Sequence, residues 1–377
     1  MGALAHLDSY RVLRDAARNP DAVAAAWKAR GGKVAGYRCL TVPEELILAA
    51  GMLPHPLYGT PDPVGPADAY FQSCTCELAR NLFDRALAGK YAGLDLVLFG
   101  NTCDIVRKLT DLWNGYIPGA RAWLCNTPQK IRNEASRDYT IEELRRTAAA
   151  IGRVAGREPD RAALADAIRL TNETRRLLRA IFELRAGEAQ RFSAAEALDI
   201  VMGASVLPKP EANAALARLL EDLARVEPVA RSGPRILVTG SLLDSTALLE
   251  LIEQEGGGVV AEDLCTSLRY FWHPVPAADD PFEALYRHFD RRPVCACLHP
   301  LDARFDFLTE LIAAFRVEAV VCFNLKYCHP FLYEAPIFQQ RLQARGLPTI
   351  VLEVGHDHSG LGQLRTRLQA FVEMLTL

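Results

Sequence analysis

The chain has 377 residues, of which 50% are hydrophobic and 24% charged, and its formal net charge is -3. This composition is typical of a globular protein that is large enough for two or three domains. The small net charge gives no electrostatic reason to expect nucleic acid or an anionic membrane as a partner, and no apolar run reaches the roughly 20 residues that span a bilayer.

The first third of the chain alternates predicted helices and strands. Residues 3–30 are rich in Ala with charged interruptions, which predicts an amphipathic helix rather than a secretory signal. Thr41 is predicted to cap the next helix, with Glu44 three residues later as in a capping box. The elements expected after it are a helix over 75–89, the apolar strand "GLDLVLFGN", a helix over 104–113 and the strand "RAWLCN".

The pattern changes in the middle of the chain and then returns. From about Ile141 to Arg231, apolar residues recur at three- and four-residue spacing without a strand-like run, which predicts helices only. Beyond this segment we expect strands at 235–239, 258–261, "PVCACL", "VEAVVCFN" and "PTIVLEV", and helices at 244–255, 281–290, 302–315, 331–345 and 361–375.

Strands that alternate with helices indicate βαβ units and parallel sheets. The sequence therefore predicts an α/β fold with two doubly wound lobes of the Rossmann or flavodoxin kind and a helical segment between them. The expected divisions are 1–140 for an N-terminal lobe with its leading helix, 141–231 for the helical segment, and 232–377 for the C-terminal lobe.

Ten cysteines lie in a chain with no predicted export signal, which favours thiols or metal ligands over disulfides. Cys103 and Cys328 each follow an apolar strand, at the edge where doubly wound sheets bind ligands. Cys39 and Cys103 also precede predicted helices, whose N–H groups and dipole lower the pKa of a thiol. One interpretation is a metal site shared by Cys39, Cys103 and Cys328 in the crevice between the lobes. The other is that each thiol only packs as a small apolar side chain.

The remaining cysteines differ in context. Cys125 and Cys322 lie inside apolar strands, where packing is the favoured interpretation. Cys295 and Cys297 are two residues apart in the predicted strand "PVCACL", which would place both on one face of a core strand. Cys76 begins a predicted helix and is a candidate for an additional ligand.

Several longer stretches resemble, in the same order, the 2-hydroxyacyl-CoA dehydratase and benzoyl-CoA reductase subunit family. They extend over roughly residues 36–375 and are "GYRCLTVPEELILAAGMLPHPL", "CELARNLFDRALAGKYAGLDLVLFGNTCDIVRKLTDLW", "DLCTSLRYFWHPV", "NLKYCHPFLYEAPIFQQRL" and "GQLRTRLQAFVEML". The resemblance implies that Cys39, Cys103 and Cys328 bind one [4Fe-4S] cluster, with one iron open to water or substrate. It also implies a two-subunit assembly, as a heterodimer or homodimer of related chains. The sequence has no P-loop, so ATP hydrolysis is assigned to a separate ATP-dependent iron–sulfur activator.

The resemblance implies an iron–sulfur lyase: a dehydratase subunit that converts a 2-hydroxyacyl-CoA into an enoyl-CoA through a ketyl radical anion. Ordinary elimination is unfavourable, because the β-proton is unactivated and the hydroxyl is α to the carbonyl. One electron added to the carbonyl lets the hydroxyl leave. The open iron would act as a Lewis acid, and an oxygen-sensitive cluster implies a reducing cytoplasm.

Three alternatives remain open. The chain is a subunit of a benzoyl-CoA-reductase-type acyl-CoA reductase, or a non-catalytic partner that binds a cluster and relays electrons. The third alternative is a double-cubane reductase, which would need about six cluster cysteines. The candidates for its additional ligands are Cys74, Cys76 and Cys125.

Supporting residues are also predicted from their positions. Glu45 is expected to approach the cluster or the leaving hydroxyl, whereas Glu44 is a second catalytic candidate or only a capping residue. The candidate substrate-binding residues, which flank the ligands or lie near the crevice, are Asn101, Thr102, Asn324, Lys326 and Arg269.

Overall fold

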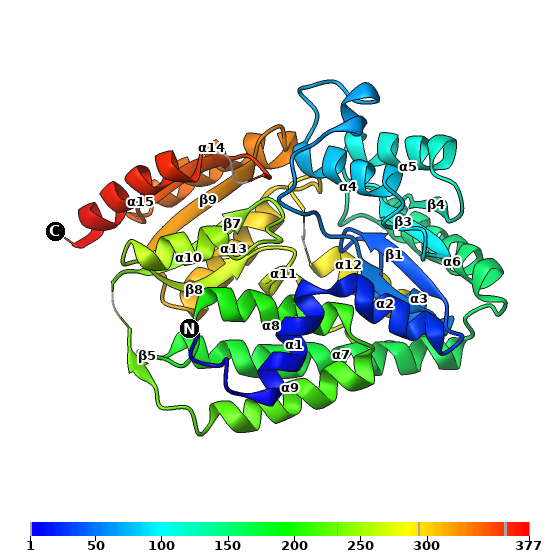
Figure 1. Ribbon diagram of the computed structural model, residues 1–377, viewed down its shortest axis with the longest axis horizontal. Coiled ribbons are helices and arrows are strands. Elements are labelled where there is room, and N and C mark those ends of the chain that lie inside the picture. Colours follow the sequence, from blue (N-terminus) through cyan, green and yellow to red (C-terminus); the bar gives the residue numbers. More distant parts are fainter. Residues whose placement is uncertain (1, 232, 293–294, 358–359, 377) are drawn as a thin grey trace.

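Two parallel sheets of four strands each form the frame of the molecule (Figure 1). The structure is a computed structural model and describes residues 2–231, 233–292, 295–357 and 360–376. The first sheet has the order β2-β1-β3-β4 and consists of β1 (Val34–Arg38), β2 (Leu53–Pro56), β3 (Leu96–Gly100) and β4 (Arg121–Cys125). The second has the order β10-β9-β7-β8 and consists of β7 (Arg235–Gly240), β8 (Gly258–Asp263), β9 (Ala319–Leu325) and β10 (Thr349–Val354). The predicted α/β fold with two lobes is confirmed.

The two sheets share one winding pattern. In the first, the chain passes from β1 to β2 on one side and then returns to β3 on the other side of β1. In the second it passes from β7 to β8 and then to β9 on the other side of β7. Each lobe therefore has a point where the strand order reverses, between β1 and β3 and between β7 and β9. Doubly wound folds bind ligands beyond the carboxyl ends of the strands at such points.

Helices cover the sheets and connect the lobes (Figure 1). The N-terminal part contains α1 (Asp8–Arg18), α2 (Pro20–Ala29), α3 (Glu44–Ala49), η1 (Pro66–Ala69), α4 (Glu77–Leu87) and α5 (Asp104–Tyr116). The middle contains α6 (Glu134–Ala155), α7 (Arg161–Glu183), η2 (Leu184–Ala186), α8 (Ala194–Val206), α9 (Lys209–Leu223) and the short pair β5 (Ala189–Gln190) and β6 (Val229–Ala230). The C-terminal part contains α10 (Ala247–Gln254), α11 (Leu268–Phe271), α12 (Pro281–Arg291), α13 (Asp302–Ala314), α14 (His329–Gln343) and α15 (Leu361–Thr376).

Two predictions about the N-terminal third are wrong in detail. The helix expected over residues 3–30 is two helices, because Pro20 has no N–H to continue the first and instead occupies the first turn of α2. Thr41 does not cap α3, whose N-cap is Pro43, without a side-chain hydrogen bond. The capping box fails because Glu44 is bound by side chains from distant helices instead. The strand β1, which was not predicted, leads directly into Cys39.

The strand predicted over "PVCACL" is also wrong within the described residues. Residues 293–294 lie outside them, and residues 295–298 form a turn in which the Leu298 N–H donates to the Cys295 carbonyl at 3.0 Å. A turn of this kind removes the strand geometry on which the shared-face argument for Cys295 and Cys297 depended.

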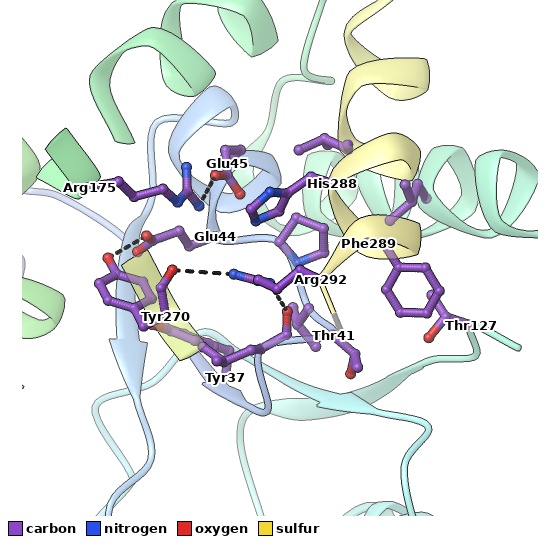
Figure 2. Close-up of a pocket in the computed structure, with 15 residues that line it drawn as sticks. Tyr37, Thr41, Glu44, Glu45, Thr127, Arg175, Tyr270, His288, Phe289 and Arg292 are labelled. Carbon is purple, nitrogen blue, oxygen red and sulfur yellow. Dashed lines mark hydrogen bonds and ion pairs between the residues drawn. The ribbon is translucent and has the colours of Figure 1, made fainter. Parts of the chain in front are cut away.

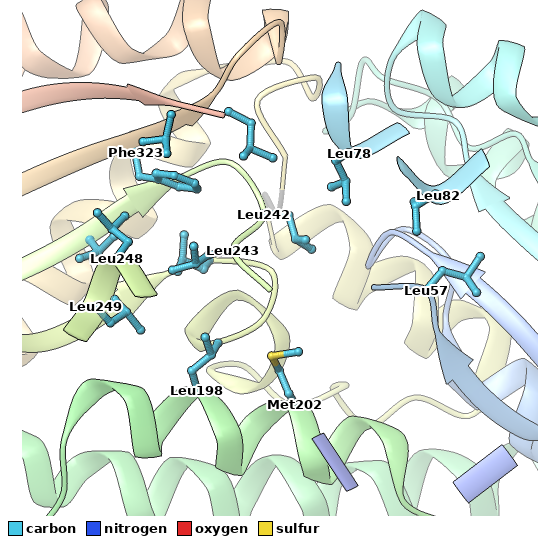
Figure 3. Packing of buried hydrophobic residues seen from close by; sticks show 14 of the residues in the cluster. Leu57, Leu78, Leu82, Leu198, Met202, Leu242, Leu243, Leu248, Leu249 and Phe323 are labelled. Atoms are coloured by element: carbon cyan, nitrogen blue, oxygen red, sulfur yellow. The ribbon is translucent and has the colours of Figure 1, made fainter. Parts of the chain in front are cut away.

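One apolar cluster crosses the boundary between the lobes (Figure 3). Leu57 and Leu82 come from the N-terminal lobe, Met202 comes from α8, and Leu242 and Phe323 come from the C-terminal lobe. Buried apolar area is the main favourable term in folding, so this cluster fixes the lobes relative to each other. Within the part of the chain that the structure describes, no helix combines the length and apolarity needed to cross a bilayer.

Candidate functional site

A cavity of about 780 Å³, counted with its open mouth, lies between the lobes and is lined by seven of the ten cysteines. We call it the thiol cavity. Its cysteines are Cys39, Cys76, Cys103, Cys265, Cys295, Cys297 and Cys328. The three thiols singled out as possible co-ligands, Cys39, Cys103 and Cys328, thus face one space.

The fold explains why these three thiols converge. Cys39 follows β1, Cys103 follows β3 and is the N-cap of α5, and Cys328 follows β9 and is the N-cap of α14. The first two therefore flank the reversal point of one sheet, and the third lies at the reversal point of the other. Cys39 has φ +90° and Tyr327 has φ +62°, a conformation that costs non-glycine residues energy and is concentrated at functional sites.

Four further cysteines complete the lining. Cys76 is the N-cap of α4, and Cys265 follows β8. Cys295 and Cys297 reach the cavity from the turn that replaces the predicted strand. Sequence reasoning had identified Cys76 but missed the other three. The available signals were the position of Cys265 in "DLCTSLRYFWHPV" and the doubled cysteine in "CAC".

The lowering of the thiol pKa that was expected for Cys39 and Cys103, as residues that precede helices, is not found at either. Burial raises the pKa of Cys39 to about 12. Burial also raises the pKa of Cys103, although backbone N–H groups of α5 act in the opposite direction. The pKa of Cys76 is lowered to about 6, first because Cys328 donates a hydrogen bond to its sulfur and then because of N–H groups in α4. The prediction failed at Cys103 because desolvation of the thiolate outweighs the helix terminus.

The rest of the thiol cavity is mostly apolar. Its walls include Leu78, Leu82, Leu109 and Leu242, and Arg38 is the one charged side chain among the described residues that line it. An apolar wall lowers the local dielectric and limits access of water. The Cys39 thiol donates to the Thr102 hydroxyl over 3.6 Å, so the predicted residue Thr102 lies inside the cavity.

A second cavity, of about 500 Å³ counted with its open mouth, is lined by Leu40 and Thr41, the residues that follow Cys39. Figure 2 shows this cavity. We call it the charged cavity. The polar side chains that line it are Tyr37, Thr41, Glu44, Glu45, Thr127, Arg175, Tyr270, His288 and Arg292. A smaller cavity of about 390 Å³ touches both, since it shares Cys39 and Cys265 with the thiol cavity and Tyr37, Leu40 and Tyr270 with the charged cavity.

Glu44 and Glu45 line the charged cavity and not the thiol cavity. Glu44 accepts a hydrogen bond from the Tyr270 hydroxyl at 2.6 Å and forms a 3.0 Å ion pair with Lys209 of α9. Glu45 accepts from Arg175 at 2.6 Å and from the Thr171 hydroxyl at 2.9 Å. These contacts, with the Arg175 charge as the largest favourable cause, lower the pKa of Glu45 despite burial.

Arg292 and His288 face the same cavity from the end of α12 (Figure 2). Arg292 donates to the backbone carbonyls of Leu40 at 2.9 Å and Tyr270 at 3.3 Å, so it holds the turn beside Cys39. Burial, with the Arg175 charge second, lowers the pKa of Arg292 to about 10. Burial also lowers the pKa of His288 well below its ordinary value, and the ring is therefore neutral at pH 7.

The other predicted substrate residues lie outside both cavities. Asn101 donates to Asn126 at 2.7 Å, and Asn324 is 1% exposed within β9. Lys326 lies in the turn after β9, where its N–H donates to the Val354 carbonyl. Arg269 is fully buried and donates to Asp263 at 2.7 Å, so its charge is already compensated.

Three cysteines do not reach the thiol cavity. Cys125 in β4 and Cys322 in β9 are 0% and 2% exposed and pack in hydrophobic clusters, as their strand positions predicted. Cys74 is exposed and contacts Gln72. The cysteines thus separate into one shared cavity and isolated packing or surface positions.

The donor set of the thiol cavity fits an iron–sulfur cluster. Among the described residues, no three His, Cys, Asp or Glu side chains lie close enough to hold a single metal ion. Ligands of an iron–sulfur cluster lie on different corners of a larger inorganic core and are spaced more widely. Cysteine thiolates are the protein ligands of such clusters, and an apolar surrounding tunes their potential. Cys39, Cys103 and Cys328 supply this chemistry from two lobes.

Comparison with known proteins identifies the family of the chain. The family model described as "2-hydroxyglutaryl-CoA dehydratase, D-component" matches residues 39–375. The chain belongs to this family. Similar proteins include the (R)-phenyllactyl-CoA dehydratase beta subunit of Clostridium sporogenes, which is 24% identical over 92% of each chain. Others are a benzoyl-CoA reductase subunit of Thauera aromatica, 27% identical over 92% of this chain and 91% of that one, and the putative dehydratase subunit YjiM of Escherichia coli K12, 29% identical over 92% and 93%. The names of these relatives describe each of them as an enzyme subunit.

Proposed function

We propose that the chain is the cluster-bearing subunit of a 2-hydroxyacyl-CoA dehydratase that removes water from a 2-hydroxyacyl-CoA through a ketyl radical anion to form an enoyl-CoA. The observation that supports this most directly is the convergence of Cys39, Cys103 and Cys328 on one cavity at the reversal points of both sheets. Relatives named as phenyllactyl-CoA and lactoyl-CoA dehydratase beta subunits support the reaction class.

In this proposal, Cys39, Cys103 and Cys328 hold one [4Fe-4S] cluster. The cluster would supply single-electron transfer and an open iron that acts as a Lewis acid. The protein's own residues perform three tasks. The three cysteines would bind the cluster as thiolates, and the Thr102 hydroxyl would then donate to the Cys39 sulfur and orient it. The leucine walls exclude water that would quench a radical.

The proposed assembly contains two further proteins. The enzyme is completed by a second, related chain, as the names of the relatives suggest, and a separate ATP-dependent activator delivers the electron. The acyl-CoA would enter the thiol cavity, whose mouth is open to solvent.

Iron analysis of the anaerobically purified chain tests the proposal. About four irons and four sulfides per chain are expected for one cluster. Cys39→Ser, Cys103→Ser and Cys328→Ser should each lose most of this iron, whereas Cys322→Ser, which replaces a packing thiol, should keep it. Circular dichroism confirms that each variant is folded. Folded wild-type protein without iron would contradict the proposal.

A second candidate is a double-cubane reductase, favoured by one specific observation: seven thiols line the cavity, and about six are needed. The additional ligands would come from Cys76, Cys265, Cys295 and Cys297 rather than from Cys74 and Cys125, which lie elsewhere. This candidate predicts about eight irons per chain and loss of about half of them in Cys295→Ser. The one-cluster proposal predicts about four, unchanged in Cys295→Ser.

The similarity to a benzoyl-CoA reductase subunit supports an acyl-CoA reductase as a further candidate. Product analysis with an activator and ATP distinguishes the reactions. A dehydratase releases an enoyl-CoA from a 2-hydroxyacyl-CoA without net consumption of reductant, whereas a reductase consumes two electrons for each product. A chain that shows neither activity with a matched second subunit, but still accepts electrons, is a relay partner.

A further inference from the structure

Unpartnered polar atoms are concentrated in the charged cavity. In the described part of the chain, eleven buried side-chain nitrogen or oxygen atoms have no hydrogen-bond partner. Six of them belong to residues that line this cavity. One of the six, Glu44 Oε2, lies 3.0 Å from Lys209 Nζ in an ion pair; the other five, without any partner, are on Thr41, Thr127, Arg175, His288 and Arg292. Buried polar groups in native proteins are nearly always satisfied, so such a concentration indicates a ligand or ordered water.

The charges around the cavity do not balance. Glu45 pairs with Arg175, and Glu44 pairs with Lys209. Arg292, 7% exposed, donates only to backbone carbonyls and has no carboxylate partner among the described residues. With His288 neutral, the cavity has one excess positive charge. A buried charge without a counter-ion is costly, so one negative charge from a ligand would be strongly favoured.

His288 adds a hydrogen-bond acceptor beside this cation. Its Nδ1 lies 3.2 Å from the Pro274 carbonyl, which can only accept, so Nδ1 carries the ring proton. The other nitrogen, Nε2, is then an unpartnered acceptor. His288 and Arg292 are four residues apart at the end of α12, a spacing that places side chains on the same helix face. Figure 2 shows both directed into the cavity.

We infer that the charged cavity binds a small hydroxycarboxylate, with its carboxylate accepting from Arg292 and its hydroxyl donating to Nε2 of His288. The carboxylate supplies the missing negative charge, and the adjacent hydroxyl satisfies the acceptor. A carboxylate without a hydroxyl satisfies only the first group, and a neutral alcohol only the second. The site is separate from the thiol cavity and does not depend on a bound cluster.

Calorimetric titration of the full-length, anaerobically purified protein with glycolate and acetate tests this inference. Both probes carry one carboxylate, and only glycolate has the neighbouring hydroxyl. Glycolate should bind saturably and about fivefold more tightly than acetate, the ratio expected for one additional hydrogen bond. Absence of saturable glycolate binding overturns the inference.

Three variants assign the binding to the two side chains. Arg292→Gln should weaken glycolate binding about 30-fold or more, because it removes a buried charged partner. Arg291→Gln is the matched control, since Arg291 is the neighbouring residue and is exposed; it should bind glycolate like the wild type. His288→Asn keeps a donor near the Pro274 carbonyl but lacks Nε2, and should bind glycolate and acetate equally. Equal effects of Arg292→Gln and Arg291→Gln would overturn the assignment even if glycolate binds.

Arg292→Gln also removes the bonds to the turn beside Cys39, so its fold must be checked by circular dichroism. If that variant is unfolded, His288→Asn still tests whether the charged cavity binds glycolate. A variant that binds acetate normally but no longer prefers glycolate must be folded, so misfolding cannot explain this result. A free hydroxy acid and the acyl end of a carboxylated thioester share the carboxylate that would contact Arg292. Displacement of glycolate by succinyl-CoA but not by butyryl-CoA identifies the thioester, and displacement by neither identifies the free acid.

Discussion

The thiol cavity and the charged cavity both border the chain around Cys39, yet they are built from opposite chemistry. Seven thiols and an apolar wall form the first, with Arg38 as its one charged side chain among the described residues. Two buried ion pairs and an additional arginine surround the second. The turn at Cys39 therefore has two roles. Its thiol lines the apolar cavity, while the backbone carbonyl of Leu40 is held by Arg292 of the charged cavity.

The contrast also separates what each cavity contributes to stability. Thiol side chains are weak hydrogen-bond partners and lose little when replaced, whereas a buried ion pair that loses one partner leaves an uncompensated charge. Mutations on the two sides of the Cys39 turn should therefore affect different measurements.

The largest expected effect is on the Glu45–Arg175 pair. Glu45→Ala leaves Arg175, 4% exposed, without its carboxylate and should lower the free energy of unfolding by about 3–5 kcal/mol. Iron per folded chain should remain at the wild-type value. Cys103→Ser should show the opposite pattern to Glu45→Ala: it should lose iron, while the free energy of unfolding of the metal-free protein should change little. Urea denaturation and iron analysis measure both. A Glu45→Ala protein that is stable but iron-free would place Glu45 in the cluster site instead.

A double-mutant cycle on Glu44 and Lys209 tests whether this network acts as paired charges. Lys209 is 1% exposed and also donates to the Ala204 carbonyl at 3.0 Å. Each of Glu44→Gln and Lys209→Met leaves a buried charge, so the two losses should not add. The double variant should lose about 1–3 kcal/mol less free energy of unfolding than the sum of the losses in the two single variants. Additive losses measured by urea denaturation would show that the two charges do not interact.

The sequence predicted the thiol cavity better than the charged one. Strand periodicity and the rule that parallel strands bind ligands at their carboxyl ends were enough to bring Cys103 and Cys328 together. Cys39 joined them because it precedes a predicted helix, and the resemblance then implied the same three residues as cluster ligands. The strand β1 before Cys39 was not recognised, because "VAGYR" is short and interrupted by glycine. Cys295 and Cys297 were assigned to a strand because local spacing carries no information on which loops meet in space.

The charged cavity was not predictable in the same way. Glu44 and Glu45 follow a proline and occupy the first turn of α3, which has the local appearance of helix capping. Their partners, Lys209 and Arg175, are more than 100 positions away, and only tertiary packing identifies them. Arg269 shows the opposite error, since it lies in a motif near the crevice but is satisfied by Asp263.

The packing thiols provide the next comparison. Cys125→Ser and Cys322→Ser place a hydroxyl in an apolar cluster and should lower stability by about 1–2 kcal/mol, the cost of burying an incompletely satisfied polar group. Neither should change the iron content, because neither lines the thiol cavity. Thermal unfolding and iron analysis of the two variants test this, with Cys74→Ser, an exposed position, as the unaffected control. Iron loss in Cys125→Ser would instead return Cys125 to the set of cluster ligands.

The smallest expected effect concerns an ionisable contact within the C-terminal lobe. His356 Nε2 lies 3.2 Å from Asp244, which also accepts from the Gly59 N–H at 2.8 Å. Interaction with Asp244 raises the pKa of His356 above its ordinary 6.5 in spite of burial, and His356 lowers the pKa of Asp244 below 3.8. The stabilisation from His356 is complete below pH 6.5 and is lost as pH rises through the raised pKa. The stabilisation from Asp244 is complete above pH 3.8 and is lost as pH falls through the lowered pKa.

His356→Gln isolates this contribution, because glutamine can still donate to Asp244 but cannot become charged. The wild type should exceed the variant in free energy of unfolding by about 1 kcal/mol between pH 4.5 and 6, and the difference should shrink toward pH 8.5. Urea denaturation at about pH 5, 7 and 8.5 measures it. The two ion pairs of the charged cavity join glutamates to arginine or lysine rather than to histidine, so Glu44→Gln should show no such decline over this range. A constant difference for His356→Gln would mean that His356 does not become charged over this pH range.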